Sequence, residues 1–161
     1  MLPKGKQSTK YELDYFSKTL REMKSLQKLD FWLCTEEFND KFYLVFKDLK
    51  MLKHLSLCFD ITQEIPDQGL ENFFLTFKDT KALNALKLHF LYSHKFDNKM
   101  LHSLYENLKE ASSLRYLSLK MELAKRLKEE EKKDFISKFG DVKVEMEADY
   151  IERRSSFSLF E

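Results

Sequence analysis

Residues 52–59 read LKHLSLCF, and residues 114–121 repeat the same arrangement of apolar side chains as LRYLSLKM. The arrangement is an apolar residue, two spacers, and then three apolar residues that alternate with single spacers. Three more copies occur at 26–33, 83–90 and 139–146, so consecutive copies begin 25 to 31 residues apart. The alternating part has the period of two that is typical of a half-buried strand. We therefore expect five strands, one in each copy.

The segment before each copy has a helical period instead. Apolar residues lie near positions −13, −10, −6 and −3 from the start of the copy, and these steps of three and four form one stripe on a helix. The fifth segment is truncated. The stripe residues are Leu13, Phe16, Leu20 and Met23; Phe42, Phe46 and Leu49; Leu70, Phe73, Phe77 and Thr80; Leu101, Leu104, Leu108 and Ala111; and Phe135 and Ile136.

A helix with one apolar stripe and a strand with one apolar face cannot each bury that face alone. Stacked units bury a continuous core, and strands joined by helical crossovers must be parallel. The sequence therefore predicts an α/β solenoid, a short horseshoe arc of about five parallel strands backed by helices. An open α/β domain with unequal crossovers is less consistent with five copies that share both patterns. Two ladders of buried leucines should cross the central strands, formed by Leu55, Leu86 and Leu117 and by Leu57, Leu88 and Leu119.

The predicted domain organisation has three parts: an N-terminal extension at 1–9, the array at 10–147, and a tail at 148–161. The tail is rich in aromatic and aliphatic residues, and it either caps the last unit or docks on a partner. Local signals agree with the helix positions. They are a capping box at Thr9–Glu12, loop residues at Pro66–Gly69, Asp97 before the fourth helix, and a charged, exposed helix at Glu122–Lys133.

The repeated segments resemble the leucine-rich repeat consensus, L-x-x-L-x-L followed by an Asn or Cys site. Leu52–Leu57 and Leu114–Leu119 match its first part without exception. The long helical segments and Ile65–Gly69, which is similar to an I-x-D-x-G turn, imply the ribonuclease-inhibitor-like subclass. The amino-acid composition, with 15 Phe but only 3 Gly and 2 Pro, resembles that of divergent ciliate leucine-rich repeat proteins.

The sequence departs from this consensus at the Asn/Cys site. That position holds Cys34 in the first copy and a non-consensus residue in the other four, so an asparagine ladder is mostly missing. A larger apolar residue comes one place earlier in every copy. We expect these residues to pack the descending loops: Leu33, Phe59, Phe90, Met121 and Met146.

Composition excludes several classes of protein. The formal net charge of +1 argues against nucleic-acid binding through bulk positive charge, although it leaves a local basic patch open. There is no run of 18 apolar residues for a membrane span, and the first residues lack the features of a secretory signal. Two cysteines fit a reducing compartment. We expect a cytoplasmic protein, with the cytoskeleton or the cilium as candidate locations. The basic N-terminus leaves open a mitochondrial targeting signal.

No motif for catalysis or cofactor binding stands out. Phosphate-binding, dinucleotide-binding and zinc-protease motifs are absent from the sequence, and His89 and His94 have poor metal-ligand spacing. Cys58 and His89 occupy equivalent positions in adjacent copies, which we interpret as neighbours on a solvent-facing surface. We therefore expect no enzyme, no cofactor and no metal site.

The spacers of the predicted strands point away from the leucines and form three rows on the concave side of the array. Large amphipathic residues in these rows predict a protein-binding surface. Trp32 has an alternative role, packing under the N-terminal segment as a cap. The candidate protein-binding residues are Trp32, His54, Lys87, His89, Tyr116 and Lys120. The fifth copy is expected to add Asp141, Lys143 and Glu145 to the three rows in that order.

The resulting functional hypothesis is a non-catalytic protein-binding scaffold or structural subunit of a larger assembly, cytoskeletal or ciliary. The alternative is a regulator of an enzyme, because some long arrays of the resembled subclass activate a GTPase. A third hypothesis is an RNA-recognition module, whose affinity would fall steeply with salt.

Overall fold

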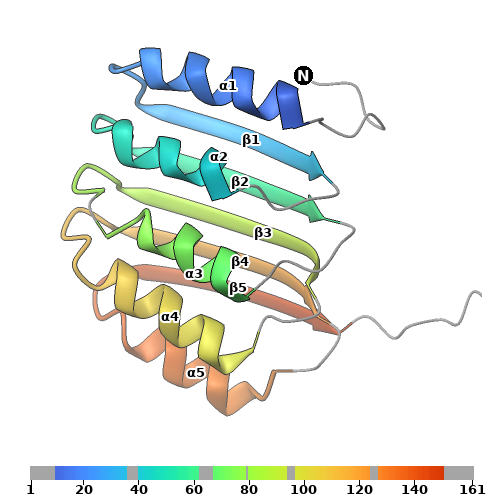
Figure 1. The fold of residues 1–161 in the computed structure, drawn as a ribbon. Helices are drawn as coiled ribbons and strands as arrows, with labels where there is room; N and C mark the ends of the chain where they lie inside the picture. Colours follow the sequence, from blue (N-terminus) through green and yellow to red (C-terminus); the bar gives the residue numbers. More distant parts are fainter. Residues whose placement is uncertain are drawn as a thin grey trace, which may run out of the picture.

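The computed structural model describes residues 10–35, 40–61, 67–78, 80–93, 97–123 and 127–150. Five parallel strands form one sheet in the order β1-β2-β3-β4-β5, and the helices cover one face of it (Figure 1). The strands are β1 (Lys28–Thr35), β2 (His54–Ile61), β3 (Ala85–Ser93), β4 (Tyr116–Leu123) and β5 (Lys143–Tyr150). The helices are α1 (Lys10–Glu22), α2 (Asp40–Tyr43) followed by the 3-10 helix η1 (Leu44–Asp48), α3 (Asp67–Leu75), α4 (Asn98–Leu108) and α5 (Glu129–Ser137). The predicted α/β solenoid arc is confirmed.

The two leucine ladders lie where the repeat places them. Strand pairing puts Leu55, Leu86 and Leu117 side by side, and Leu57, Leu88 and Leu119 beside them. All six are at most 2% exposed. The ladders form the strand side of the core, as predicted.

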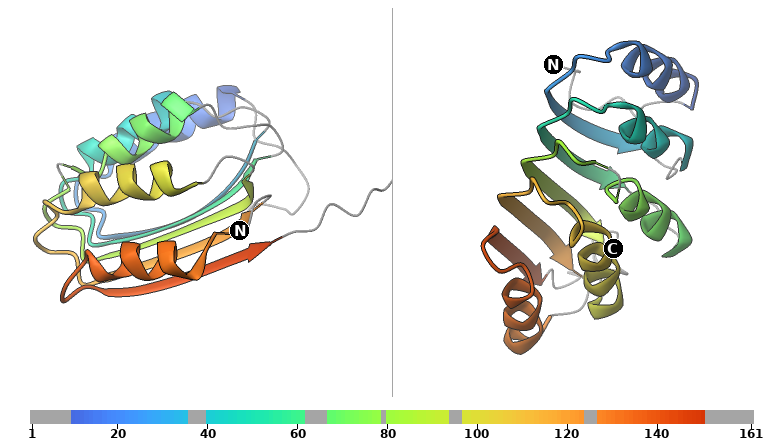
Figure 2. Two further views of the ribbon diagram at one scale, coloured as in Figure 1. Left: turned by 90° about the horizontal axis from the view of Figure 1, so that it is seen from below. Right: turned by 90° about the vertical axis from the view of Figure 1, so that its left-hand side faces the viewer.

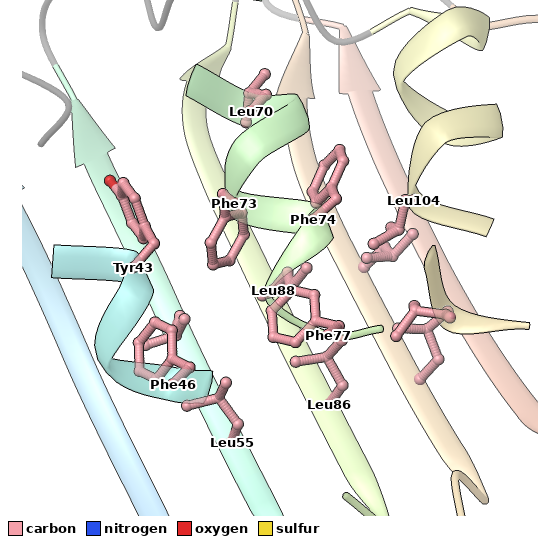
Figure 3. Packing of buried hydrophobic residues seen from close by; sticks show 14 of the residues in the cluster. Tyr43, Phe46, Leu55, Leu70, Phe73, Phe74, Phe77, Leu86, Leu88 and Leu104 are labelled. Carbon is pink, nitrogen blue, oxygen red and sulfur yellow. The ribbon is translucent and has the colours of Figure 1, made fainter. Parts of the chain in front are cut away.

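Phe73 of α3 lies at the centre of the helix side of the core. Its ring contacts Tyr43, Phe59 and Phe77 at centroid distances of 4.9, 5.2 and 5.0 Å. Figure 3 shows Phe73 and Phe77 beside the strand leucines, with Tyr43 projecting from the neighbouring helix. The helical stripes of adjacent units therefore join into one aromatic layer.

The strands are longer than the four or five residues that the alternation predicts. Each contains eight or nine residues. Leu33, Phe59, Phe90 and Met121 are therefore buried within strands. The descending loops that we expected them to pack lie outside the described residues. Parallel pairing continues past the consensus because these side chains stack across it: the rings of Phe59 and Phe90 lie 4.9 Å apart at an interplanar angle of 9°.

The fifth unit differs from the expected alignment by two residues. Leu117 pairs with Val144, where we expected Val142. The turn hydrogen bonds give the reason: Leu114 N–H donates to Ala111 O and Val142 N–H to Phe139 O, so Val142 takes the place of Leu114. A shift of two leaves the same side chains on the same face, so alternation alone could not reveal it.

The structure confirms some of the helix boundaries that local sequence signals predict and corrects others. Asp97 caps α4 by accepting a hydrogen bond from Met100 N–H at 3.1 Å, as predicted. The helix α3 begins at Asp67, so most of the expected loop at 66–69 is helical; Pro66 and the capping residue Thr9 lie outside the described residues. The expected helix at 122–133 begins only at Glu129, because Glu122 and Leu123 still pair with β5.

The two ends of the array are less well covered than its middle. Leu29 and Phe31 on β1 and Val144 and Met146 on β5 are only partly buried, because each lacks a neighbouring unit on one side. The strand β5 ends at Tyr150, three residues beyond the expected end of the array. Within the described residues, no helix has the length and hydropathy needed to cross a bilayer.

Candidate binding surface

The face of the sheet opposite the helices carries the spacers of all five strands, and we call it the concave strand face. Its first row contains Lys28, His54, Ala85, Tyr116 and Lys143. Its second row contains Asp30, Ser56, Lys87, Ser118 and Glu145. Its third row contains Trp32, Cys58, His89, Lys120 and Glu147.

The six predicted residues all lie on this face, in the rows that the repeat predicts. Trp32 is 53% exposed at the β1 edge of the third row. His54 and Lys87 are exposed, whereas His89, Tyr116 and Lys120 are partly buried among their neighbours. The prediction was wrong for the fifth strand. Lys143 and Glu145 each lie one row earlier than expected, and Asp141 lies in the turn before β5.

Tyr116 contacts three charged side chains of this surface. Its hydroxyl donates a hydrogen bond to Glu145 Oε2 at 2.6 Å, and the ammonium groups of Lys87 and Lys143 each lie 5.6 Å from its ring centroid. Lys143 Nζ also lies 2.6 Å from Glu145 Oε1. Two cations and one carboxylate therefore hold the ring, a combination of cation–π and charge-assisted contacts.

These contacts shift the pKa of the three groups in consistent directions. The hydrogen bond to Glu145 raises the pKa of Tyr116. The hydrogen bonds from Lys143 and then Tyr116 lower the pKa of Glu145, and the hydrogen bond to Glu145 raises the pKa of Lys143. The ionised glutamate and the protonated lysine are thus the favoured forms at neutral pH.

Sequence reasoning put Lys143 and Glu145 on this face but one row away from their observed places, because the fifth unit was aligned two residues away, so it did not bring them beside Tyr116. Lys143, Glu145 and Glu147 belong to the surface, and Glu147 Oε2 lies 3.0 Å from Lys120 Nζ. Their alternation with Val144, Met146 and Ala148 was the available signal.

Cys58 and His89 lie together at the centre of the third row. The sulfur of Cys58 is 3.6 Å from His89 Nδ1, within reach of a hydrogen bond. The described residues contain no group of three or more His, Cys, Asp or Glu side chains that could hold a metal ion.

As the pH falls through the lowered pKa of Glu145, we expect the contacts around Tyr116 to loosen. A depressed pKa means that folding favours the ionised form, so this contribution is present above the ordinary glutamate pKa and is lost in acid. An NMR titration of the Glu145 carboxyl carbon should give a midpoint below that of an ordinary glutamate. Lys143→Gln should raise it more than Tyr116→Phe does; an unchanged midpoint in Lys143→Gln would contradict the assignment.

Comparison with known proteins identifies a similar fold but no family. No protein-family model matches the sequence, and no curated protein matches it. The fold is similar to the solved structure of leiomodin-1 actin-binding site 2, with a TM-score of 0.55 and 10% sequence identity. The match covers 91% of this chain and 82% of that one. Together with the parallel sheet, it shows a leucine-rich-repeat type of fold.

Proposed function

We propose that the chain is a non-catalytic protein-binding scaffold or structural subunit of a larger assembly, and that its concave strand face binds the partner. The observation that carries this proposal is the fixed ring of Tyr116, held by Lys87, Lys143 and Glu145. A side chain that is ordered before binding loses little conformational entropy when the complex forms. Tyrosine and tryptophan are also common anchors of protein interfaces.

Trp32 supplies a second anchor on the same face. Its large indole is more than half exposed, which leaves apolar area available to a partner. The two anchors lie on β1 and β4, three strand spacings or about 14 Å apart across the sheet, and two rows or about 13 Å apart along the strand direction. A separation of this size suits a partner surface that crosses several strands.

The cytoskeleton is the setting in which we propose to look first for the partner. The similar structure carries the name of an actin-binding site, so filamentous actin is the first protein to test. We also retain as a proposal the ribonuclease-inhibitor-like subclass. The long crossovers between β2 and β3 and between β3 and β4 support it.

The double substitution Trp32→Ala with Tyr116→Ala should weaken partner binding by about a hundredfold, because each anchor contributes on the order of 1–2 kcal/mol or more. Co-sedimentation with actin filaments, and recovery of the assembly from a native extract, would measure the loss. A matched control, Tyr15→Ala with Leu75→Ala, removes exposed apolar area from α1 and α3 and should bind normally.

The C-terminal tail is an alternative binding site for the partner, and the same binding assay distinguishes it from the concave strand face. Deletion of residues 151–161 leaves β5 intact and removes the aromatic residues beyond it. Release of the partner by this deletion, with no effect of the double substitution, would show that the concave strand face is not the binding surface. A partner whose turnover changes on binding would instead favour the enzyme-regulator hypothesis.

A further inference from the structure

The five turns that lead from a helix into a strand lie side by side along one edge of the array (Figure 1, left; Figure 2, right). We call residues 23–27, 49–53, 76–84, 109–115 and 138–142 the turn edge. These segments contain eight lysines and arginines against three acidic residues, a net charge of +5. The whole chain carries +1, so everything outside the turn edge carries −4. The charge of the protein is therefore strongly segregated.

The opposite connections do not share this charge. The segments that lead from a strand into a helix, 36–39, 62–66, 94–97 and 124–128, contain four basic and four acidic residues. Positive charge is thus a property of one edge and not of loops in general.

Backbone hydrogen bonds align lysines of neighbouring turns. Each turn is closed by an N–H that donates to the carbonyl three residues earlier, from Leu26 to Met23, Leu52 to Leu49 and Leu83 to Thr80. The residue after each acceptor is Lys24, Lys50 and Lys81, respectively. Since neighbouring strands are about 4.8 Å apart, these equivalent positions form a row of like charges.

Within the described part of the chain, no salt bridge neutralises this row. Lys24, Lys50, Lys53, Lys78 and Lys81 are all exposed, and none of them forms a salt bridge in the described part of the chain. Aligned like charges repel one another, and an anionic partner relieves that repulsion.

Two exposed methionines accompany the lysines at the β1 end of this edge. Met23, the last apolar residue of the first helical stripe, is 44% exposed, and Met51 in the next turn is 48% exposed. Lysines beside flexible apolar side chains suit a lipid surface, where the cations meet headgroup phosphates and the apolar groups enter the interface.

Nucleic acid fits the same edge less well. The aromatic residues of its described turns are Phe77 and Phe139, and both are buried and unable to stack on bases. The guanidinium of Arg115 is engaged with the carbonyls of Ser112 and Leu114.

We propose that the turn edge docks on the surface of an anionic membrane, with Lys24, Lys50 and Lys81 at the lipid phosphates and Met23 and Met51 among the headgroups. The contact is peripheral and does not involve the concave strand face. It is therefore independent of the proposed protein partner, which can be bound at the same time.

Vesicle co-sedimentation of the full chain tests this proposal. Binding is expected to vesicles of phosphatidylcholine with about one third phosphatidylserine, and not to phosphatidylcholine alone. Lys24→Glu, Lys50→Glu and Lys81→Glu together should lower the partition coefficient at least about a hundredfold, since each lysine contributes roughly fivefold. The control Lys18→Glu, Lys128→Glu and Lys133→Glu changes the net charge equally and lies away from the turn edge, so its binding should fall far less.

The methionines provide a second, salt-independent measurement. Met23→Ser with Met51→Ser should weaken binding at about 0.5 M salt, where the lysine contribution is screened. Three outcomes would overturn the proposal: equal loss in the two lysine variants, no preference of the wild-type chain for anionic vesicles, or tighter binding to single-stranded RNA than to vesicles. Circular dichroism of each variant confirms that it is folded.

Discussion

Phe73→Ala is expected to lower the free energy of unfolding by about 3–5 kcal/mol, the range for removal of a buried aromatic ring. Phe73 is fully buried and its ring lies against aromatic residues from α2, η1, β2 and α3. These rings belong to two adjacent units, so the cavity left by alanine would lie at the joint between them and could not collapse without moving both. Urea denaturation followed by circular dichroism measures the change.

Leu75→Ala is the matched control, because it shortens an exposed side chain of the same helix. We expect it to change the free energy of unfolding by less than about 0.5 kcal/mol. A Phe73→Ala variant as stable as this control would mean that the aromatic layer does not join the units.

The sequence predicted the central units well because two independent periodicities agree there. Leu86 and Leu88 alternate on a strand, while Leu101 and Leu104 follow a helical step, and each set can be buried only against the other. This agreement between local pattern and packing is what determines the order and direction of the strands.

The ends of the strands and the fifth unit could not be predicted in the same way. Strand length depends on pairing with neighbours, and Glu122 lies in β4 although its charge argues for a surface loop. In the fifth unit Val142, Val144 and Met146 alternate in a manner that fits two registers equally. The pairing of Leu117 with Val144, together with the turn hydrogen bond from Val142 to Phe139, distinguishes the two registers.

The candidate binding surface was predicted in its residues but not in its interactions. Alternation identifies Tyr116 as outward-facing, yet its contact with Glu145 depends on the register of β5. The turn edge was hidden for a different reason: the net charge of +1 is a sum over the whole chain, and it conceals a net charge of +5 at one edge. Only the fold brings these separated lysines into one row.

Leu86→Ala should lower the free energy of unfolding by about 2–5 kcal/mol, whereas Leu29→Ala should cost only about 1–2 kcal/mol. The two leucines occupy the same ladder, through Leu55, and differ in their position along the array. Leu86 is fully buried between units on both sides, but Leu29 lies on the edge strand β1 and is only partly buried. Truncation of a partly buried side chain removes less buried apolar area than truncation of a fully buried one, and it leaves no closed cavity.

This comparison also tests whether the β1 end of the array is open. Both variants remove the same atoms from the same ladder, so any difference in their unfolding free energies comes from the neighbouring unit that only Leu86 has on both sides. Urea denaturation of the two variants, followed by the fluorescence of Trp32, which lies on β1 like Leu29, and by circular dichroism of the whole array, measures each cost. Equal losses would mean that the first strand is covered as completely as the third. The apolar edge at Leu29 and Phe31 would then be sealed by a cap, and binding surfaces would have to be sought on the concave strand face and the turn edge alone.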